Sequence, residues 1–377
     1  MIPITVVTGF LGAGKTSLIA HLLDNTQDRR IAVIVNELAA SSIDSAYLHG
    51  GEHITLADEP LLRSVSGGRA GAGKESETID QLVQLATMDP PPDAIVVETS
   101  GSSPVAALAD RIHQAPALEG HAFLDSVITI IDVTSVNFYW KDPQLRILLH
   151  DQLHNADLVI LNKMDRAGFW VRRSALALVK RATHHSELIS AEFGRIPVEE
   201  MIATGRRSTR NAAINGTEQS AVVSNPRFHP VVARLVTEAR PFHPERLHQW
   251  LDSEWPGVIR VKGFAWLATD MNQVYVIDVA AAQREIGIEG TWYGALPAEE
   301  RPDAPEISAA LASGAWEDRR QTITVIGTPE AVEREMRRLR ACLLTDTELD
   351  RGPHGWRRLN DPITAQFQIA DASPTPE

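Results

Sequence analysis

The stretch Gly9-Phe10-Leu11-Gly12-Ala13-Gly14-Lys15-Thr16 decides how the first part of this 377-residue chain folds. It follows the apolar run Ile4-Thr5-Val6-Val7, which predicts a buried strand, and it precedes Ser17-Leu18-Ile19-Ala20-His21-Leu22-Leu23, which predicts a helix. A loop that wraps a phosphate brings several backbone N–H groups close to oxygen, and glycines permit that approach because they have no Cβ atom. The helix directs the positive end of its dipole at the anion. This order of elements predicts a P-loop and a bound nucleotide.

Each residue of the loop has an expected part in that site. Lys15 would neutralise the β and γ phosphates, and the Thr16 hydroxyl would hold Mg²⁺. The residues expected to contact the nucleotide here are Gly9, Gly12, Ala13, Gly14, Lys15, Thr16 and Ser17. A glycine-rich turn without a ligand is the alternative, and the flanking strand and helix disfavour it.

Short, β-branched apolar runs recur between helical stretches in the first half of the chain. They are Ile4 to Thr8, Ile31 to Val35, Ala94 to Val97, Val127 to Ile131 and Leu158 to Leu161. Such runs favour a mostly parallel sheet that is buried on both faces. Ligands of such sheets gather at the carboxyl ends of the strands. Polar residues follow every run, so we expect the functional site there.

Asn162-Lys163-Met164-Asp165 follows the last of these runs. The Asp165 carboxylate would accept two hydrogen bonds from the N1–H and the exocyclic amine of guanine, groups that adenine does not offer in that arrangement. Asn162 and Lys163 would brace the loop and pack on the base. A surface turn is the alternative for four residues alone, but behind a P-loop the pattern favours GTP over ATP.

Glu98-Thr99-Ser100-Gly101 follows the third run. Glu98 can reach the Mg²⁺ shell, directly or through water, and a strand-end acid that caps a turn is the alternative. The Gly101 backbone N–H could contact the γ-phosphate and so sense hydrolysis. Ser102 stands where many small GTPases carry a water-orienting glutamine, so we expect slow hydrolysis with Lys15, Glu98 and Gly101 as the catalytic groups.

Composition limits the partners and the compartment. The net charge of −13 disfavours binding to nucleic acid or to an anionic membrane, and no apolar run reaches membrane-spanning length. A single cysteine, Cys342, excludes an intramolecular disulfide and a zinc cage of several thiolates. The N-terminal apolar run lacks a charged leader. We therefore expect a cytoplasmic protein.

The second half has a different pattern. Small and polar residues after position 208 predict a linker, and beyond it strand-like runs mix with helices at Glu245 to Trp250 and Pro329 to Leu344. We expect an α/β fold in which a P-loop GTPase domain with a mostly parallel sheet is followed by a smaller α+β domain. The predicted limits are 1–207 for the GTPase domain, 208–228 for the linker, 229–350 for the second domain and 351–377 for a C-terminal tail, the last seven residues of which should be disordered.

Taken together, these motifs resemble the CobW-like family of metallochaperone GTPases. Blocks at 9–16, 36–37, 98–101, 131–132 and 156–165 carry the resemblance, as do weaker ones at 240–244, 260–264, 319–321 and 342–346. The resemblance implies that Glu37 and Glu98 join Thr16 around Mg²⁺. It also implies that GTP binding and hydrolysis are coupled to delivery of zinc, cobalt or iron to a client protein.

The metal motif of the family, Cys-x-Cys-Cys, is missing from this chain. The corresponding stretch, 66–74, contains no cysteine, and Arg69, Gly71 and Ala72 are the best matches for the replaced positions. Cys342 is expected to be a buried structural thiol. Zinc therefore stays uncertain as a ligand.

Histidines are the other candidate metal ligands. His150 and His154 lie four residues apart on a predicted helix, although such a pair arises by chance among thirteen histidines. His49 and His53 flank Glu52 in a predicted loop, with simple solvent exposure as the alternative. His184 and His185 are adjacent and would diverge.

Three functions fit the sequence. The first is a slow GTPase that acts as a nucleotide-gated metallochaperone or regulator of a client protein, with an altered or lost metal site. The second is a GTP-responsive interaction module with negligible hydrolysis, and the third is a P-loop kinase, which would prefer ATP. The sequence identifies no client and leaves a homodimer open.

Overall fold

The structure is a computed structural model, and it describes residues 1–26, 29–37, 62–66, 72–101, 104–183, 185–208, 231–280, 283–312 and 316–371. The chain divides into two compact units, Met1–Val232 and Ala233–Glu377. Among the described residues, no helix combines the length and the apolar composition that crossing a membrane requires.

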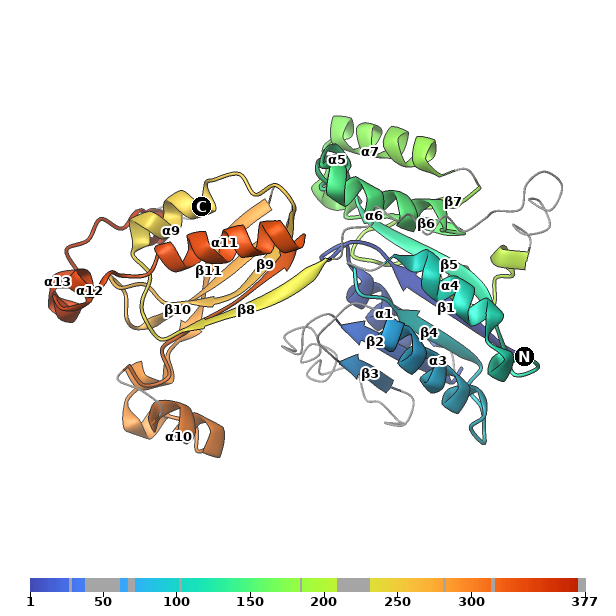
Figure 1. The fold of residues 1–377 in the computed structure, drawn as a ribbon, viewed down its shortest axis with the longest axis horizontal. Helices are drawn as coiled ribbons and strands as arrows, with labels where there is room; N and C mark the ends of the chain where they lie inside the picture. Colours follow the sequence, from blue (N-terminus) through green and yellow to red (C-terminus); the bar gives the residue numbers. More distant parts are fainter. Residues whose placement is uncertain are drawn as a thin grey trace, which may run out of the picture. The chain divides into compact units, whose positions relative to one another are not determined.

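The first unit is built on a seven-stranded sheet in which all the strand pairs are parallel (Figure 1). In spatial order its strands are β3 (Leu62–Ser66), β2 (Ile31–Glu37), β4 (Ala94–Glu98), β1 (Ile2–Thr8), β5 (Ala122–Asp132), β6 (Leu158–Asn162) and β7 (Glu187–Ser190). The predicted parallel sheet is confirmed. The P-loop strand β1 lies at its centre, so the loop after β1 is flanked by the loops that follow β4 and β5.

Helices cover both faces of this sheet because alternate side chains of each buried strand are apolar on both sides. Val7, Val33 and Val96 pack with the apolar side of α1, and Val6, Ile34 and Val97 pack with α3 and α4. The helices are α1 (Lys15–Asp24), α3 (Ala72–Ala86), α4 (Val105–Gln114), α5 (Val136–Lys141), α6 (Pro143–His154) and α7 (Phe169–Ala182), with short 3₁₀ turns η2 (Pro116–Leu118), η3 (Met164–Arg166) and η4 (Val198–Glu200).

The second unit contains a five-stranded sheet with helices beside it, as the sequence predicted. In spatial order the strands are β11 (Gln283–Thr291), β10 (Gln273–Ala280), β9 (Val258–Ala265), β12 (Gln321–Gly327) and β8 (Val232–Glu238). The strands β11, β10, β9 and β12 pair in antiparallel fashion. The helices are α9 (Pro244–Leu251), α10 (Pro305–Ala312), α11 (Pro329–Ala341), α12 (Asp346–Leu349), α13 (Gly352–Trp356) and α14 (Pro362–Asp371), with 3₁₀ turns η5 (Tyr293–Ala295) and η6 (Ala298–Glu300).

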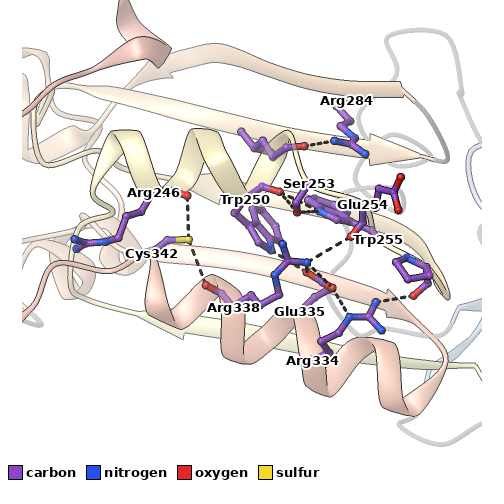
Figure 2. Close-up of polar contacts among 12 residues, drawn as sticks. Arg246, Trp250, Ser253, Glu254, Trp255, Arg284, Arg334, Glu335, Arg338 and Cys342 are labelled. Atoms are coloured by element: carbon purple, nitrogen blue, oxygen red, sulfur yellow. Dashed lines mark hydrogen bonds and ion pairs between the residues drawn. The ribbon is translucent and has the colours of Figure 1, made fainter.

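A buried carboxylate joins α9 to α11 in this unit (Figure 2). Glu335 is fully buried and accepts hydrogen bonds from Trp250 Nε1 at 3.0 Å, from Arg334 Nε at 2.7 Å and from Arg338 Nη1 at 3.1 Å. The two arginines also donate to backbone carbonyls of the turn after α9, at Pro256 and Glu254. Glu335 thereby fixes both the helix pair and the turn that leads into β9.

The C-terminal residues are more ordered than the sequence led us to expect. Part of the predicted tail, 351–377, forms α13 and α14, and Trp356 and Ile363 are fully buried. Trp356 packs with Ala268 and Leu344, and its ring lies 5.1 Å from that of Trp316 at a tilt of 55°, so the large apolar area of this side chain joins α13 to the second unit. The predicted linker, from 209 on, and the last six residues lie outside the described residues.

Candidate functional site

The P-loop has the backbone conformation that its glycines predict. Gly9, Gly12 and Gly14 all have positive φ, at 133°, 77° and 107°. A Cβ atom on Gly9 would lie 2.1 Å from the carbonyl oxygen of Ile130, on the neighbouring strand β5. The loop is therefore closed by backbone contacts that admit only glycine. Gly14 directly precedes α1, whose N-terminus begins at Lys15.

Lys15 lies inside the curve of this loop. It is 6% exposed, and its Nζ donates to the carbonyl oxygens of Gly9 at 2.9 Å and Phe10 at 3.4 Å. The backbone thus holds the ammonium group where an anion cradled by the loop would meet it. Thr16 is half-buried and Ser17 is exposed, both in the first turn of α1. Ala13 is buried, and its N–H donates to the Phe10 carbonyl at 3.1 Å.

The loop after β4 contacts the P-loop directly. A Cβ atom on Gly101 would lie 2.6 Å from Leu11 N, 2.7 Å from Gly9 O and 2.9 Å from Lys15 Nζ. Gly101 therefore lies directly against the P-loop backbone and the Lys15 ammonium group. Glu98, the last residue of β4, is 7% exposed and lies beside Val7 of the P-loop strand.

Asn162, at the end of β6, joins the P-loop to the loop Asn162-Lys163-Met164-Asp165, which the sequence predicts to contact guanine. Its Nδ2 donates to the Ala13 carbonyl at 2.8 Å, and a Cβ atom on Gly14 would lie only 2.4 Å from that nitrogen. Asn162 is 2% exposed, so this hydrogen bond is shielded from water. The two sequence motifs thus meet in one site.

Lys163 and Asp165 lie in the same loop, directly after β6. Lys163 adopts a left-handed conformation, with φ of 60°, and its Nζ forms an ion pair with Asp132 Oδ2 at 2.8 Å. Asp132, at the end of β5, also accepts hydrogen bonds from the hydroxyls of Thr134 and Ser135. The Asp165 side chain is 23% exposed, and its carboxylate lies 3.9 Å from Arg166 Nε. The Asp165 carboxylate is therefore open to a ligand from the solvent side.

Two contributors to this site were not predicted from the sequence. Asp132 entered the sequence analysis only as part of the block 131–132, without a role, and the structure shows that it forms an ion pair with Lys163. Gly194, in the loop after β7, donates its N–H to Asn162 Oδ1 at 2.9 Å, and the loop also accepts the Met164 N–H at the Ala191 carbonyl. The signal that the sequence offers for that loop is the glycine itself, Gly194, and its φ in the structure is 70°.

The residues present fit a guanine nucleotide with Mg²⁺. Gly9, Gly14 and Gly101 pack the loop so closely that added Cβ atoms would clash with Ile130, Asn162 and Leu11, and a cation, Lys15, lies within the curve of the loop, where backbone N–H groups and a helix N-terminus favour an anion. Thr16 and Glu98 offer the oxygen ligands that Mg²⁺ prefers. Bound Mg²⁺ would neutralise charge that develops on the phosphates, and Lys15 would add its own charge from within the loop.

The remaining predicted ligands are less well placed or lie outside the described part. Glu37 ends β2, and its side chain is not described; Ala72 begins α3. His49, Glu52, His53, Arg69, Gly71, Ser102 and His184 lie outside the described residues. His150 and His154 stack at 5.6 Å on α6. Within the described residues, no group of three or more His, Cys, Asp or Glu side chains is arranged to hold a metal ion.

Comparison with known proteins gives matches over both units. Residues 3–190 match the family model described as CobW/HypB/UreG, nucleotide-binding domain, and residues 231–343 match the cobalamin synthesis protein cobW C-terminal domain. Each match falls on one of the two structural units.

Curated relatives align with much of the chain. The zinc-regulated GTPase metalloprotein activator 1 of Dictyostelium discoideum is 26% identical over 414 residues, which cover 98% of this chain and 86% of that protein. The zinc chaperone CobW of Pseudomonas aeruginosa is 33% identical over 229 residues, 53% of this chain and 59% of that protein. The zinc chaperone YjiA of Escherichia coli is 26% identical and covers 72% and 84% of the two chains.

Among solved structures, the Zn(II)-bound YjiA GTPase from E. coli aligns with 20% identity over 91% of this chain and 99% of that chain, at a TM-score of 0.39. HypB from Helicobacter pylori in complex with nickel aligns at 13% identity over 58% and 90% of the two chains, at a TM-score of 0.34. The two family models, found in the expected order over a P-loop unit and a second α+β unit, lead to one conclusion: the chain belongs to the CobW family of P-loop GTPases.

Proposed function

We propose that this protein is a GTP-gated metallochaperone or regulator of a client protein, which hydrolyses GTP slowly and has an altered or lost metal site. The observation that carries the proposal is the meeting of Lys15, Gly101 and Asn162 at the P-loop. A triphosphate, its terminal phosphate and a base would each have a partner there. Glu37, Glu98 and Thr16 are the proposed oxygen ligands of Mg²⁺.

The proposal of slow hydrolysis rests on what the loop after β4 lacks in sequence. A residue that orients water usually follows the glycine that senses the γ-phosphate, and this chain has Ser102 at that position. Lys15 and the backbone amides of the loop would still stabilise developing negative charge. Turnover without an orienting side chain is expected to be slow.

The proposal of an altered metal site rests on cysteine chemistry. Relatives are named zinc chaperones, whereas the only cysteine here, Cys342, is 4% exposed and its Sγ donates to the Arg338 carbonyl at 3.3 Å. Burial raises the pKa of the Cys342 thiol to about 12, so it stays protonated at neutral pH. A protonated thiol is a poor zinc ligand because the thiolate is the species that binds. Any zinc carried to a client would need nitrogen or oxygen ligands.

Phosphate release tests the enzymatic part of the proposal. We expect Lys15→Ala to lower GTP hydrolysis at least about tenfold, because a charge that stabilises the transition state is lost. Lys180→Ala is the matched control. Lys180 is exposed on α7, so this substitution removes the same charge away from the P-loop. Equal rates in wild type and Lys15→Ala would favour the alternative, a GTP-responsive interaction module with negligible hydrolysis.

Zinc titration with and without a GTP analogue tests the metal part. The proposal expects weak zinc binding that Cys342→Ser leaves unchanged. Tight, stoichiometric binding that Cys342→Ser abolishes would contradict it. Tight binding that survives the substitution would mean that histidines or carboxylates have replaced the thiolates of the family motif, and would make the protein a zinc carrier.

A client protein and a homodimer are the proposed partners. The client protein follows from the family relationship, since relatives are named as chaperones and as an activator of metalloproteins, whereas the homodimer is an expectation that the sequence leaves open. Light scattering with GDP and with a GTP analogue tests the homodimer: a mass of one chain in both states would exclude it.

A further inference from the structure

Helix α6 forms hydrogen bonds with the chain after β4 at two points, Gly101 and Val105. Gln152 is fully buried, and its Nε2 donates to the Gly101 carbonyl at 3.4 Å. The neighbouring Asp151 accepts the Val105 N–H at 2.7 Å through Oδ2 and so caps the N-terminus of α4. Two consecutive residues of one helix therefore hold the last residue before residues 102–104 and the first residue after them.

Both residues are themselves fixed in place. The Gln152 carbonyl accepts the Thr129 hydroxyl at 2.7 Å, and Thr129 lies on β5 opposite Thr8, the last residue of the P-loop strand. Asp151 Oδ1 accepts the Asn155 Nδ2 at 3.3 Å. Burial raises the pKa of Asp151, against the backbone N–H groups of Val105 and Ala106, which lower it. The hydrogen bonds to α4 thus offset part of the effect of burial on this carboxylate.

Gly101 links these hydrogen bonds of α6 to the proposed phosphate site. Its backbone lies so close to Leu11, Gly9 and Lys15 that a Cβ atom would fall within 3 Å of each. A displacement of Gly101 of even a few tenths of an ångström would therefore change its distance to a γ-phosphate. The same displacement would change few contacts of the α and β phosphates, which the P-loop backbone holds.

We infer that Asp151 and Gln152 are positioning residues that hold the Gly101 N–H in place for the γ-phosphate, and that they set the preference of this protein for GTP over GDP. The inference rests on the proposed function, because it takes the P-loop ligand to be a guanine nucleotide. We class both as positioning residues because their side chains act on Gly101 and on the N-terminus of α4.

Gln152→Leu tests the inference with a side chain of similar size that cannot donate. We expect its affinity for a non-hydrolysable GTP analogue to fall roughly five- to tenfold, the loss of one buried hydrogen bond, while its affinity for GDP stays within about twofold of wild type. Gln144→Leu, half-exposed in the same helix, is the matched control and should change neither affinity.

Asp151 gives a second test that does not depend on how Gln152→Leu folds. Asp151→Asn keeps an oxygen that accepts the Val105 N–H and should retain the wild-type ratio of the two affinities, whereas Asp151→Ala should lower it. Fluorescent GDP and GTP-analogue titrations, with circular dichroism as a check on folding, provide the readout.

The outcomes separate this inference from the proposed function. Equal losses for GDP and the GTP analogue, or no loss for either, would overturn the positioning role alone, because a merely structural role would affect both nucleotides alike. A wild-type protein that binds no guanine nucleotide would overturn the proposed function and this inference with it.

Discussion

Asp165 is the residue on which the choice of base depends. Its side chain is 23% exposed at the edge of the loop that Asn162 and Lys163 anchor. We predict that Asp165→Ala lowers GTP affinity about ten- to hundredfold, because hydrogen bonds to a charged group are lost, and leaves the weak ATP affinity nearly unchanged. Competition titrations with both nucleotides measure this. A variant that loses ATP and GTP equally, or a wild type that prefers ATP, would support a P-loop kinase instead.

The sequence predicted the residues of the site better than it predicted their connections. Lys15, Gly101 and Asn162 could be identified because each stands at a fixed place behind a buried strand. The ion pair of Lys163 with Asp132 and the hydrogen bond from Gly194 to Asn162 could not, because they join residues that are about 30 apart in the chain. Those pairs depend on which strands are neighbours, and a single sequence does not specify strand order.

At the scale of elements, Glu335 is the group that joins α9 to α11 (Figure 2). We predict that Glu335→Ala lowers the free energy of unfolding by about 1–3 kcal/mol, because it leaves the buried Trp250 N–H without an acceptor, whereas Arg334 and Arg338 are more than a third exposed and water can solvate them. Urea unfolding followed by tryptophan fluorescence measures it. Glu333→Ala, exposed on the same helix, is the control and should cost less than about 0.5 kcal/mol. Similar losses of unfolding free energy in the two variants would mean that the buried hydrogen bonds of Glu335 add no stability beyond that of an exposed glutamate in the same helix.

Glu348 links α12 to α9 and makes that link dependent on pH. Its carboxylate accepts two hydrogen bonds from Arg246, at 2.9 and 2.7 Å, and one from Thr345 N at 2.8 Å. The Arg246 hydrogen bonds lower the pKa of Glu348 from 4.5 to about 2. Since the folded state holds the charged form more tightly than the unfolded state does, this stabilisation is complete above pH 4.5 and is lost as the pH falls towards 2.

We predict, accordingly, that Glu348→Gln destabilises the second unit most above pH 4.5 and that its difference from wild type shrinks between pH 4.5 and 2. Urea titrations at several pH values, read from tryptophan fluorescence, test this, since Trp356 donates its indole N–H to the Glu348 carbonyl at 2.8 Å. Glu299→Gln, at an exposed acid, should show no such trend. A difference that stays constant across the range would contradict the pKa shift.

The strands that the sequence did not predict are short or polar. β3 reads Leu-Arg-Ser-Val-Ser, β7 has four residues and β11 carries charged residues and two glycines, so none shows the apolar run of a central strand. All three lie at the edges of their sheets. An edge strand is paired on one side only and is less constrained to be apolar, so pattern alone predicts the centre of a sheet better than its edges.

At the scale of the whole molecule, the proposed nucleotide contacts all belong to the first unit, whereas most tryptophans belong to the second. Two of the eight, Trp140 and Trp170, lie in the first unit, and the other six are Trp250, Trp255, Trp266, Trp292, Trp316 and Trp356. Fluorescence therefore reports mainly on the second unit, while circular dichroism at helix wavelengths reports on both. The two signals together can distinguish unfolding of one unit from unfolding of the other.

A ligand that binds only the folded first unit stabilises that unit by about 2.7 kcal/mol at a free concentration of one hundred times its Kd. For a unit of this size we predict a rise of roughly 5–10 °C in its Tm with GDP and Mg²⁺, seen by circular dichroism. The fluorescence midpoint should stay in place, because all the proposed nucleotide contacts belong to the first unit. Lys15→Ala should remove the shift. A fluorescence midpoint that rises together with the circular dichroism midpoint would show instead that the two units unfold as one, and that nucleotide binding is communicated to the second unit.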